Sequence, residues 1–190
     1  VRAIAEGAEG YPSRDIRLFG DGGSTTTFVS EKLALELGLQ LRPIRPFRAS
    51  VFGGSYTCAV SEKTTMRIRS RIDARFFNDV EAFVMRGTLV MPLPLPSEEL
   101  LRVARLRGVE LSEHSSAEQF ASVDILLGED LMEEVLYEEG MSRIKPKVSL
   151  SFEETRYGWI LRGNTGKPSS KYTGCLYVEP DEDTLSDGDL

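Results

Sequence analysis

The residue types that could do chemistry are concentrated in residues 18–30, Leu-Phe-Gly-Asp-Gly-Gly-Ser-Thr-Thr-Thr-Phe-Val-Ser. An apolar stretch here delivers one acid, Asp21, into a turn rich in glycine and hydroxyl side chains. Because glycine adopts backbone conformations that other residues avoid and lets another chain approach closely, this turn could hold the carboxylate facing a partner. The alternative is an ordinary surface turn in which Asp-Gly and Gly-Gly only reverse the chain.

Carboxylates must carry any acid–base chemistry in this chain. The single histidine, His114, lies in the polar segment 112–116, which is typical of a surface loop. A single histidine in a surface loop is poorly placed to serve as the base in Ser-His or Cys-His nucleophilic catalysis. Cys58 and Cys175 form no CxxC pair, so we expect no disulfide framework, no metal site and no cofactor. The cysteine content fits a reducing, intracellular compartment, and we expect a cytoplasmic location.

Strands dominate the elements that must position this turn. The alternation of apolar residues is clearest at Met66, Ile68 and Ile72. Strands are predicted over residues 15–19, 56–60, 65–72, 80–85 and 148–152. The sequence therefore predicts a mainly β protein.

Three short helices complete the expected elements. One is capped by Ser30, runs to Glu36 and ends at Gly38; another is capped by Ser97, runs through Leu106 and ends at Gly108. A third begins near Glu129. The apolar faces are predicted to be Leu33, Leu35 and Leu37 in the first helix and Leu131, Met132, Val135 and Leu136 in the third. The proline-rich residues 91–96 read as an extended connection into the second helix.

Length and composition indicate one globular domain. The chain has 190 residues, of which 41% are hydrophobic and 28% charged, and no apolar run is long enough for a membrane span. The net charge of -7 resides mostly in residues 179–190, which contain acids and no basic residue and are expected to form a solvated, mobile tail. Because the rest is nearly neutral, we expect binding to neither nucleic acid nor membrane.

Three separated segments resemble the retropepsin-like aspartic peptidases, most closely the peptidase domain of BEL/Pao-type retrotransposons. The active-site turn of that family is similar to residues 21–24, Asp-Gly-Gly-Ser, and its following residues are similar to 28–39. An apolar strand that ends in glycine behind that turn is similar to residues 123–131, which include Leu126, Leu127 and Gly128. The family's Gly-Trp-Ile segment is similar to residues 155–163.

The resemblance implies a closed retropepsin-like barrel, one lobe per chain, with residues 1–165 as the peptidase domain and 166–190 as a C-terminal extension. Asp21 would be the catalytic acid, and Gly22, Gly23 and Ser24 would shape its turn. Aspartic peptidases need two carboxyl groups, whereas this chain offers one such turn, because Asp187 in the tail lacks the strand and helix that a second would need. The resemblance therefore implies a homodimer that cleaves extended peptides, by analogy the polyprotein of a retroelement.

A flap over the cleft is expected about thirty residues after the acid. Phe52, Gly53, Gly54 and Ser55 fall there, with a glycine pair that fits a movable hairpin tip and equally fits an ordinary hairpin turn. Among the other residues in the resembling segments, Asp124, Glu129 and Asp130 are not expected to be catalytic; Asp130 is expected to be structural near a helix N-terminus, and Trp159 to be a core anchor.

One departure from the family concerns Gly22, which stands where the family has Ser or Thr. That hydroxyl forms hydrogen bonds across the dimer axis, and Gly20 also replaces a usual apolar residue. The alternative function is therefore a catalytically degenerate peptidase-like module for dimerisation or interaction. A further alternative is that residues 21–25 form a phosphate-binding loop like that of an actin-like ATPase. The short chain and the lack of a Walker lysine motif argue against it.

Overall fold

The computed structural model describes residues 1–51, 57–86, 89, 93–94, 96–113, 120–147, 150–163 and 176–179. Among them, the helices are α1 (Glu31–Glu36), α2 (Glu98–Leu106) and α3 (Glu129–Leu136). The strands of the largest sheet are β1 (Arg2–Ala5), β2 (Arg14–Gly20), β3 (Phe28–Ser30), β4 (Arg42–Val51), β5 (Thr57–Arg69), β6 (Phe77–Met85), β9 (Ile125–Leu127) and β13 (Leu176–Glu179). A smaller sheet contains β10 (Arg143–Lys147), β11 (Leu150–Glu153) and β12 (Ile160–Gly163), and β7 (Leu93–Pro94) pairs with β8 (Phe120–Ala121).

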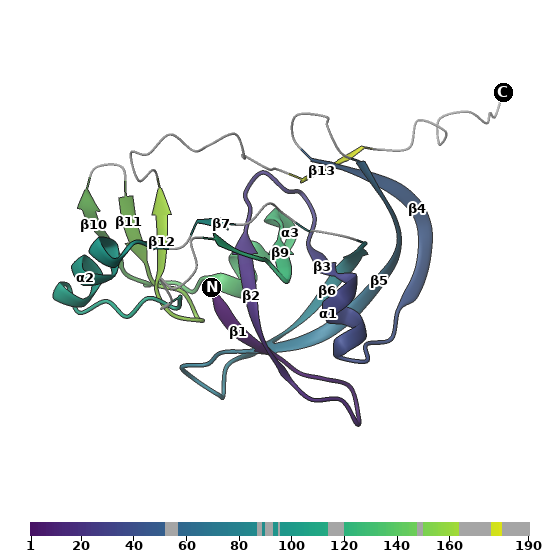
Figure 1. Cartoon of the computed structure of the whole chain (residues 1–190), viewed down its shortest axis with the longest axis horizontal. Helices are drawn as coiled ribbons and strands as arrows, with labels where there is room; N and C mark the ends of the chain where they lie inside the picture. Colours follow the sequence, from purple (N-terminus) through teal and green to yellow (C-terminus); the bar gives the residue numbers. More distant parts are fainter. Residues whose placement is uncertain are drawn as a thin grey trace.

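Six strands of the largest sheet close into a mixed β-barrel. Their order is β1-β2-β9-β3-β6-β5, and β5 pairs back onto β1 at Ile4–Arg69 and Ala5–Ile68. The pairs β2–β9 and β3–β6 are parallel and the other pairs are antiparallel. Beyond the barrel, β4 pairs with β5 and β13 pairs with β4, so that the sheet continues past its point of closure (Figure 1). The expected mainly β architecture is confirmed.

The barrel core follows the alternation of the strands, because successive side chains of a strand point to opposite faces. Met66 and Ile68 on β5 are buried in one cluster with Val80 and Ala82 of β6. Ile72, which the sequence places on the same face, is 70% exposed because β5 ends at Arg69 and the chain turns there. The prediction for Ile72 is therefore wrong.

The long strand β5 merges two strands that the sequence predicts separately. The polar run 61–64 interrupts the apolar pattern, yet β5 continues through it. Thr64 is fully buried and its hydroxyl donates to the carbonyl oxygen of Gln40 at 2.9 Å, whereas Lys63 forms an ion pair with Glu81. The alternation of inward and outward side chains thus persists through residues 61–64, but Thr64, whose hydroxyl is hydrogen-bonded, takes the inward position there.

All three expected helices are confirmed. The side chains of Ser30 and Ser97 accept hydrogen bonds from backbone N–H groups in the first turns of α1 and α2. Gly38 and Gly108 adopt positive φ angles of 63° and 68° just after these helices, a conformation that favours glycine. In α1 the apolar face is narrower than predicted, because Leu35 is 61% exposed.

A second, smaller layer lies beside the barrel, built from α2 and the sheet β10–β12 (Figure 1). Its core contains Leu101 and Ala104 of α2 together with Phe152 of β11. Trp159 packs against this cluster, in agreement with its expected role as a core anchor. The helix α2 therefore covers this small sheet.

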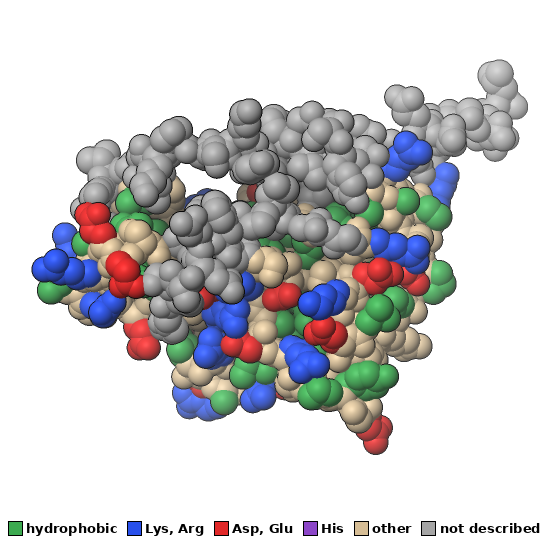
Figure 2. All heavy atoms as spheres, in the orientation of Figure 1, with side chains coloured by type: hydrophobic (Ala, Val, Ile, Leu, Met, Phe, Trp, Pro, Cys, Tyr) green, Lys and Arg blue, Asp and Glu red, His purple; other side chains and the backbone are tan. Residues whose placement is uncertain are grey.

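The surface carries charges of both signs. Figure 2 shows Lys and Arg side chains interspersed with Asp and Glu side chains over one face of the described residues. Exposed ion pairs join neighbouring strands, as between Arg67 and Asp79 at 2.8 Å. Of the helices that the structure describes, none has the length and apolar character needed to cross a membrane.

Leu33→Ala is expected to lower the free energy of unfolding by about 2–5 kcal/mol, because Leu33 is only 4% exposed and its truncation leaves a cavity in the barrel core. Leu35→Ala is the matched control, with the same substitution in the same helix, and is expected to change stability by less than about 0.5 kcal/mol. Urea denaturation measures both. Equal effects would contradict the described orientation of α1.

Candidate functional site

Asp21 lies directly after β2 and is held by its own turn. Its backbone N–H donates to the carbonyl oxygen of Leu127 at 2.9 Å, and its carbonyl oxygen accepts from the N–H of Ser24 at 3.0 Å. The carboxylate atom Oδ1 accepts from the N–H of Gly23 at 2.9 Å. The turn predicted at residues 21–24 therefore exists: two hydrogen bonds hold the backbone of Asp21, and a third reaches its carboxylate.

The second carboxylate oxygen of Asp21 has no partner. Asp21 is only 8% exposed, and its Oδ2 atom is buried without a hydrogen bond. A buried polar atom left unpaired costs on the order of 1–3 kcal/mol, so native proteins keep few of them without a use. Gly22 and Gly23, next in the chain, are exposed. The site thus combines an unpaired carboxylate oxygen with accessible backbone that carries no side chains.

Hydrogen bonds between Thr27 and Asp130 hold the segment that follows the acid turn. The hydroxyl of Thr27 donates to Oδ1 of Asp130 at 2.7 Å, and the backbone N–H of Thr27 donates to Oδ2 of the same carboxylate at 3.1 Å. The Thr27 hydroxyl oxygen also accepts from the N–H of Gly128 at 3.0 Å. We call Thr27, Gly128 and Asp130 the clasp, because they join the segment after Asp21 to the start of α3.

Gly128 allows the two segments of the clasp to touch. A Cβ atom at this position would lie 2.5 Å from the backbone nitrogen and carbonyl carbon of Thr26, closer than real contacts permit. The N–H of Glu129 donates to the carbonyl oxygen of Ser24 at 2.8 Å, and the Ser24 hydroxyl donates to the carbonyl oxygen of Thr26 at 2.8 Å. Only glycine at 128 permits this approach.

The apolar residues before Gly128 lie behind the acid turn. In the parallel pair β2–β9, Phe19 is in register with Leu126 and Gly20 with Leu127. Leu126 and Leu127 are fully buried. The structure therefore brings the predicted residues 126–128 and 21–24 together.

The neighbouring acids have other partners. Oδ2 of Asp124 accepts from the backbone N–H of Arg17 at 2.8 Å, which anchors the middle of β2. Burial raises the pKa of Asp124, and the hydrogen bond from Arg17 opposes this shift. Because the folded state then favours the protonated form, the stability that this group contributes falls as the pH rises through its raised pKa. Glu129 is exposed in the first turn of α3.

Two glycines of the turn differ in the space around them. A Cβ at Gly20 would lie 3.0 Å from Sδ of Met132 and 3.1 Å from Cδ1 of Leu136, so α3 occupies the place of a side chain there. A Cβ at Gly22 would meet only Cε of Met132, at 3.9 Å. The packing of α3 thus accounts for glycine at position 20, whereas position 22 has room for a side chain.

Sequence reasoning missed Thr27, although it named Asp130 as structural. A hydroxyl residue shortly after an acid turn is a weak signal, because three threonines stand in a row at 25–27 and only the last reaches Asp130. The proposed flap residues Phe52, Gly53, Gly54 and Ser55 lie outside the described residues. The strands on either side of them, β4 and β5, pair up to Ser50–Thr57.

No group of histidine, cysteine, aspartate and glutamate side chains suited to a metal ion occurs among the described residues. In comparisons with known proteins, no family model, no curated protein and no solved structure matches this chain. The geometry of the site offers a carboxyl group that can accept or share a proton through its unpaired oxygen.

Thr27→Val is expected to lower the free energy of unfolding by about 1–3 kcal/mol, because an almost isosteric side chain then leaves the Gly128 N–H without its acceptor. Thr25→Val is the control, since Thr25 is exposed and its hydroxyl contacts only that of Thr26 at 3.4 Å. Chemical denaturation of both variants measures the difference. An unchanged stability of Thr27→Val would contradict the clasp.

Proposed function

We propose that this chain is one subunit of an aspartic endopeptidase that works as a symmetric homodimer, with Asp21 of each subunit supplying one carboxyl group. The observation that carries the proposal is the buried, unpaired Oδ2 of Asp21 in a turn held by the clasp. The exposed glycines beside it leave room for a second turn to approach. The resemblance of three segments to retropepsin-like peptidases supports the same reading.

A dimer follows from the number of acids. Water activation requires an ionised carboxylate, while polarisation of the scissile carbonyl requires a protonated one. Of the acids in the two segments joined by the clasp, Asp130 is bound to Thr27, and Glu129 is exposed at the start of α3. A two-fold axis beside the turn would bring a second Asp21 to the unpaired oxygen, and two carboxyl groups could then share one proton.

The reaction then proceeds in two steps. The ionised carboxylate takes a proton from water while the water oxygen bonds to the carbonyl carbon of the substrate, and the protonated carboxyl gives its proton to the carbonyl oxygen. The resulting diol collapses as one hydroxyl returns its proton to a carboxylate. The amide nitrogen gains a proton from the other carboxyl group and the C–N bond breaks. Both carboxyl groups again hold one proton between them.

The substrate is proposed to be an extended peptide, by resemblance a retroelement polyprotein. Such a peptide would bind across the axis through its backbone. In the proposal, residues 52–55, which stand between β4 and β5 in the sequence, are the flap that the resemblance implies. The substrate-binding part of the proposal depends on these residues of both subunits.

Gly22 favours a second candidate function, a dimerisation or interaction module that has lost cleavage. In the resembling family a hydroxyl at this position links the two turns across the axis, and Gly22 cannot supply it. Each missing hydrogen bond of this kind corresponds to about 0.5–1.5 kcal/mol. The two candidates share the dimer and differ in catalysis.

Asp21→Asn is expected to reduce peptide cleavage by at least about 100-fold, because an amide cannot transfer the proton. The measurement is the cleavage of a peptide library at a series of acidic to neutral pH values, followed by mass spectrometry. Asp187→Asn is the matched control, since Asp187 stands in the other Asp-Gly pair, in the C-terminal tail, and its substitution is expected to have no effect.

Cleavage that is equal in wild type and Asp21→Asn would contradict the peptidase proposal. No cleavage by either protein, together with a dimer in analytical ultracentrifugation, would favour the interaction module. A chain that cleaves peptides while remaining monomeric at every concentration would contradict the shared site.

Gly22→Thr is expected to raise dimer affinity by about 5- to 150-fold, since two new hydroxyl bonds of about 0.5–1.5 kcal/mol each can form across the axis. The contact of 3.9 Å to Met132 leaves space for the side chain within the subunit. Gly22→Val is the control that has similar size without the hydroxyl. Sedimentation equilibrium measures the dissociation constants, and equal values for the two variants would contradict a hydroxyl bond across the axis.

A further inference from the structure

The side chain of Met132 lies against the segment that carries Asp21. Met132 stands in the first half of α3, where its backbone N–H donates to the carbonyl oxygen of Gly128 at 2.9 Å. A Cβ atom on Gly20 would lie 3.0 Å from Sδ of Met132, and one on Gly22 would lie 3.9 Å from its Cε. The thioether therefore runs beside the backbone from Gly20 to Gly22, with Asp21 between them.

Met132 combines this position with access to solvent. Met66 and Met85 are only 3% and 1% exposed, whereas Met132 and Met141 are partly exposed. Met141 follows α3 in the chain, and its sulfur accepts from the backbone N–H of Glu138 at 3.3 Å. Among the described methionines, only Met132 is both partly exposed and placed beside the acid turn.

A hydroperoxide can oxidise a methionine sulfur that it reaches. The sulfur lone pair attacks the terminal oxygen of the peroxide, the O–O bond breaks, and the hydrogen of the peroxide passes to the leaving oxygen. The sulfur loses two electrons, and the peroxide is reduced to an alcohol or, from hydrogen peroxide, to water. The product is methionine sulfoxide, which carries a polar oxygen where the thioether was apolar.

The surroundings of the Met132 sulfur are unfavourable for that oxygen. Toward the turn, the place of a Cβ on Gly20 is already 3.0 Å from Sδ, so little room remains there. In the other direction Met132 packs against the buried cluster that contains Val135 and Leu136. A polar oxygen without a hydrogen-bond donor is destabilising among apolar groups. Oxidation is therefore expected to shift Met132 and to loosen the turn that it supports.

We propose that Met132 is an oxidation site, at which conversion to methionine sulfoxide loosens the Asp21 turn and reduction by a methionine sulfoxide reductase restores it. The effect on the turn is a property of the folded chain alone. Its consequence for activity, a reversible loss of peptide cleavage under peroxide, rests on the proposed peptidase function.

The test treats the full chain with hydrogen peroxide and compares wild type, Met132→Leu and Met141→Leu. Peptide mass spectrometry measures the sulfoxide at each methionine. Hydrogen exchange by NMR follows the N–H groups of Gly23 and Ser24, which donate to Oδ1 and to the carbonyl oxygen of Asp21. We expect these amides to exchange at least about fivefold faster after oxidation of wild type and of Met141→Leu, and at an unchanged rate in Met132→Leu. Leucine replaces methionine at little cost in packing and has no sulfur.

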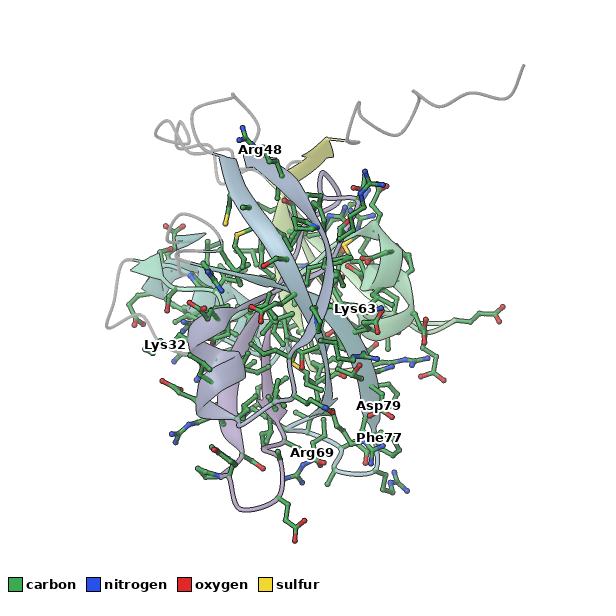
Figure 3. The ribbon with its side chains drawn as sticks, turned by 90° about the vertical axis from the view of Figure 1, so that its right-hand side faces the viewer. Lys32, Arg48, Lys63, Arg69, Phe77 and Asp79 are labelled. Atoms are coloured by element: carbon green, nitrogen blue, oxygen red, sulfur yellow. The ribbon has the colours of Figure 1, made fainter. Side chains whose placement is uncertain are left out.

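The strand pair β5–β6 is the internal reference, because its backbone pairing does not involve α3. Lys63, Phe77 and Asp79 mark this pair of strands in Figure 3. Its amides are expected to exchange at the same rate before and after oxidation. Equal acceleration in β5–β6 and in the turn would contradict a local effect of Met132.

Met132→Gln provides a second variant, because glutamine places a polar group near the position of the sulfoxide without any oxidant. We expect fast exchange at Gly23 and Ser24 in this variant, and a return of oxidised wild type to its original rate after treatment with a methionine sulfoxide reductase.

Unchanged exchange in the turn when Met132 is fully oxidised would overturn the proposal. So would the absence of sulfoxide at Met132 under conditions that oxidise Met141, or equal loosening in Met132→Leu. Cleavage assays separate this proposal from the peptidase. A turn that loosens in a protein without any cleavage supports the oxidation site and contradicts the peptidase, whereas cleavage and exchange that both resist oxidation of Met132 contradict the oxidation site alone.

Discussion

The close approach of two chain segments behind Asp21 is the constraint on which the site depends. Residues 24–27 and 128–130 lie so near each other that a side chain at Gly128 would overlap the backbone of Thr26. The Thr27 hydroxyl bridges the gap, since it donates to Asp130 and accepts from Gly128. Because these bonds are directional and the one to Gly128 is buried, they fix the turn that presents the carboxyl group, and the Oδ2 atom of Asp21 can remain unpaired without the turn rearranging.

The barrel supplies this approach through its parallel pairs. β2 ends at Gly20, immediately before Asp21, and β9 runs beside it in the same direction and ends at Leu127, immediately before Gly128. The ends of two parallel strands lie at the same edge of a sheet, so the acid turn and the start of α3 must meet there. β3, which follows the acid turn in the chain, pairs antiparallel with β9. The segment after Asp21 therefore runs back along the strand that lies beside β2. The topology thus turns two distant segments into one site.

The elements outside the closed barrel extend the molecule in two directions. α2 covers the small sheet β10–β12 with a core of its own, which gives this helix a structural role. β4 and β13 lengthen the sheet beyond the point where β5 pairs with β1. The first extension buries apolar surface, whereas the second adds a strand edge that β13 covers from Arg48 to Val51.

The sequence by itself determined the local features: the capped helices, the strand that leads to Asp21, and the glycine turn, because these depend on neighbouring residues and on periodicity. It could not determine the continuity of β5 through residues 61–64, the strand character of the proline-containing β4, or the exposure of Ile72 and Leu35, since these depend on which neighbours each face receives. Residues 126–128 were identified by resemblance, and Thr27 escaped notice among three threonines. Only the tertiary structure decided that Thr27 meets Asp130, because a hydrogen bond between residues 103 positions apart arises from strand order and not from local sequence.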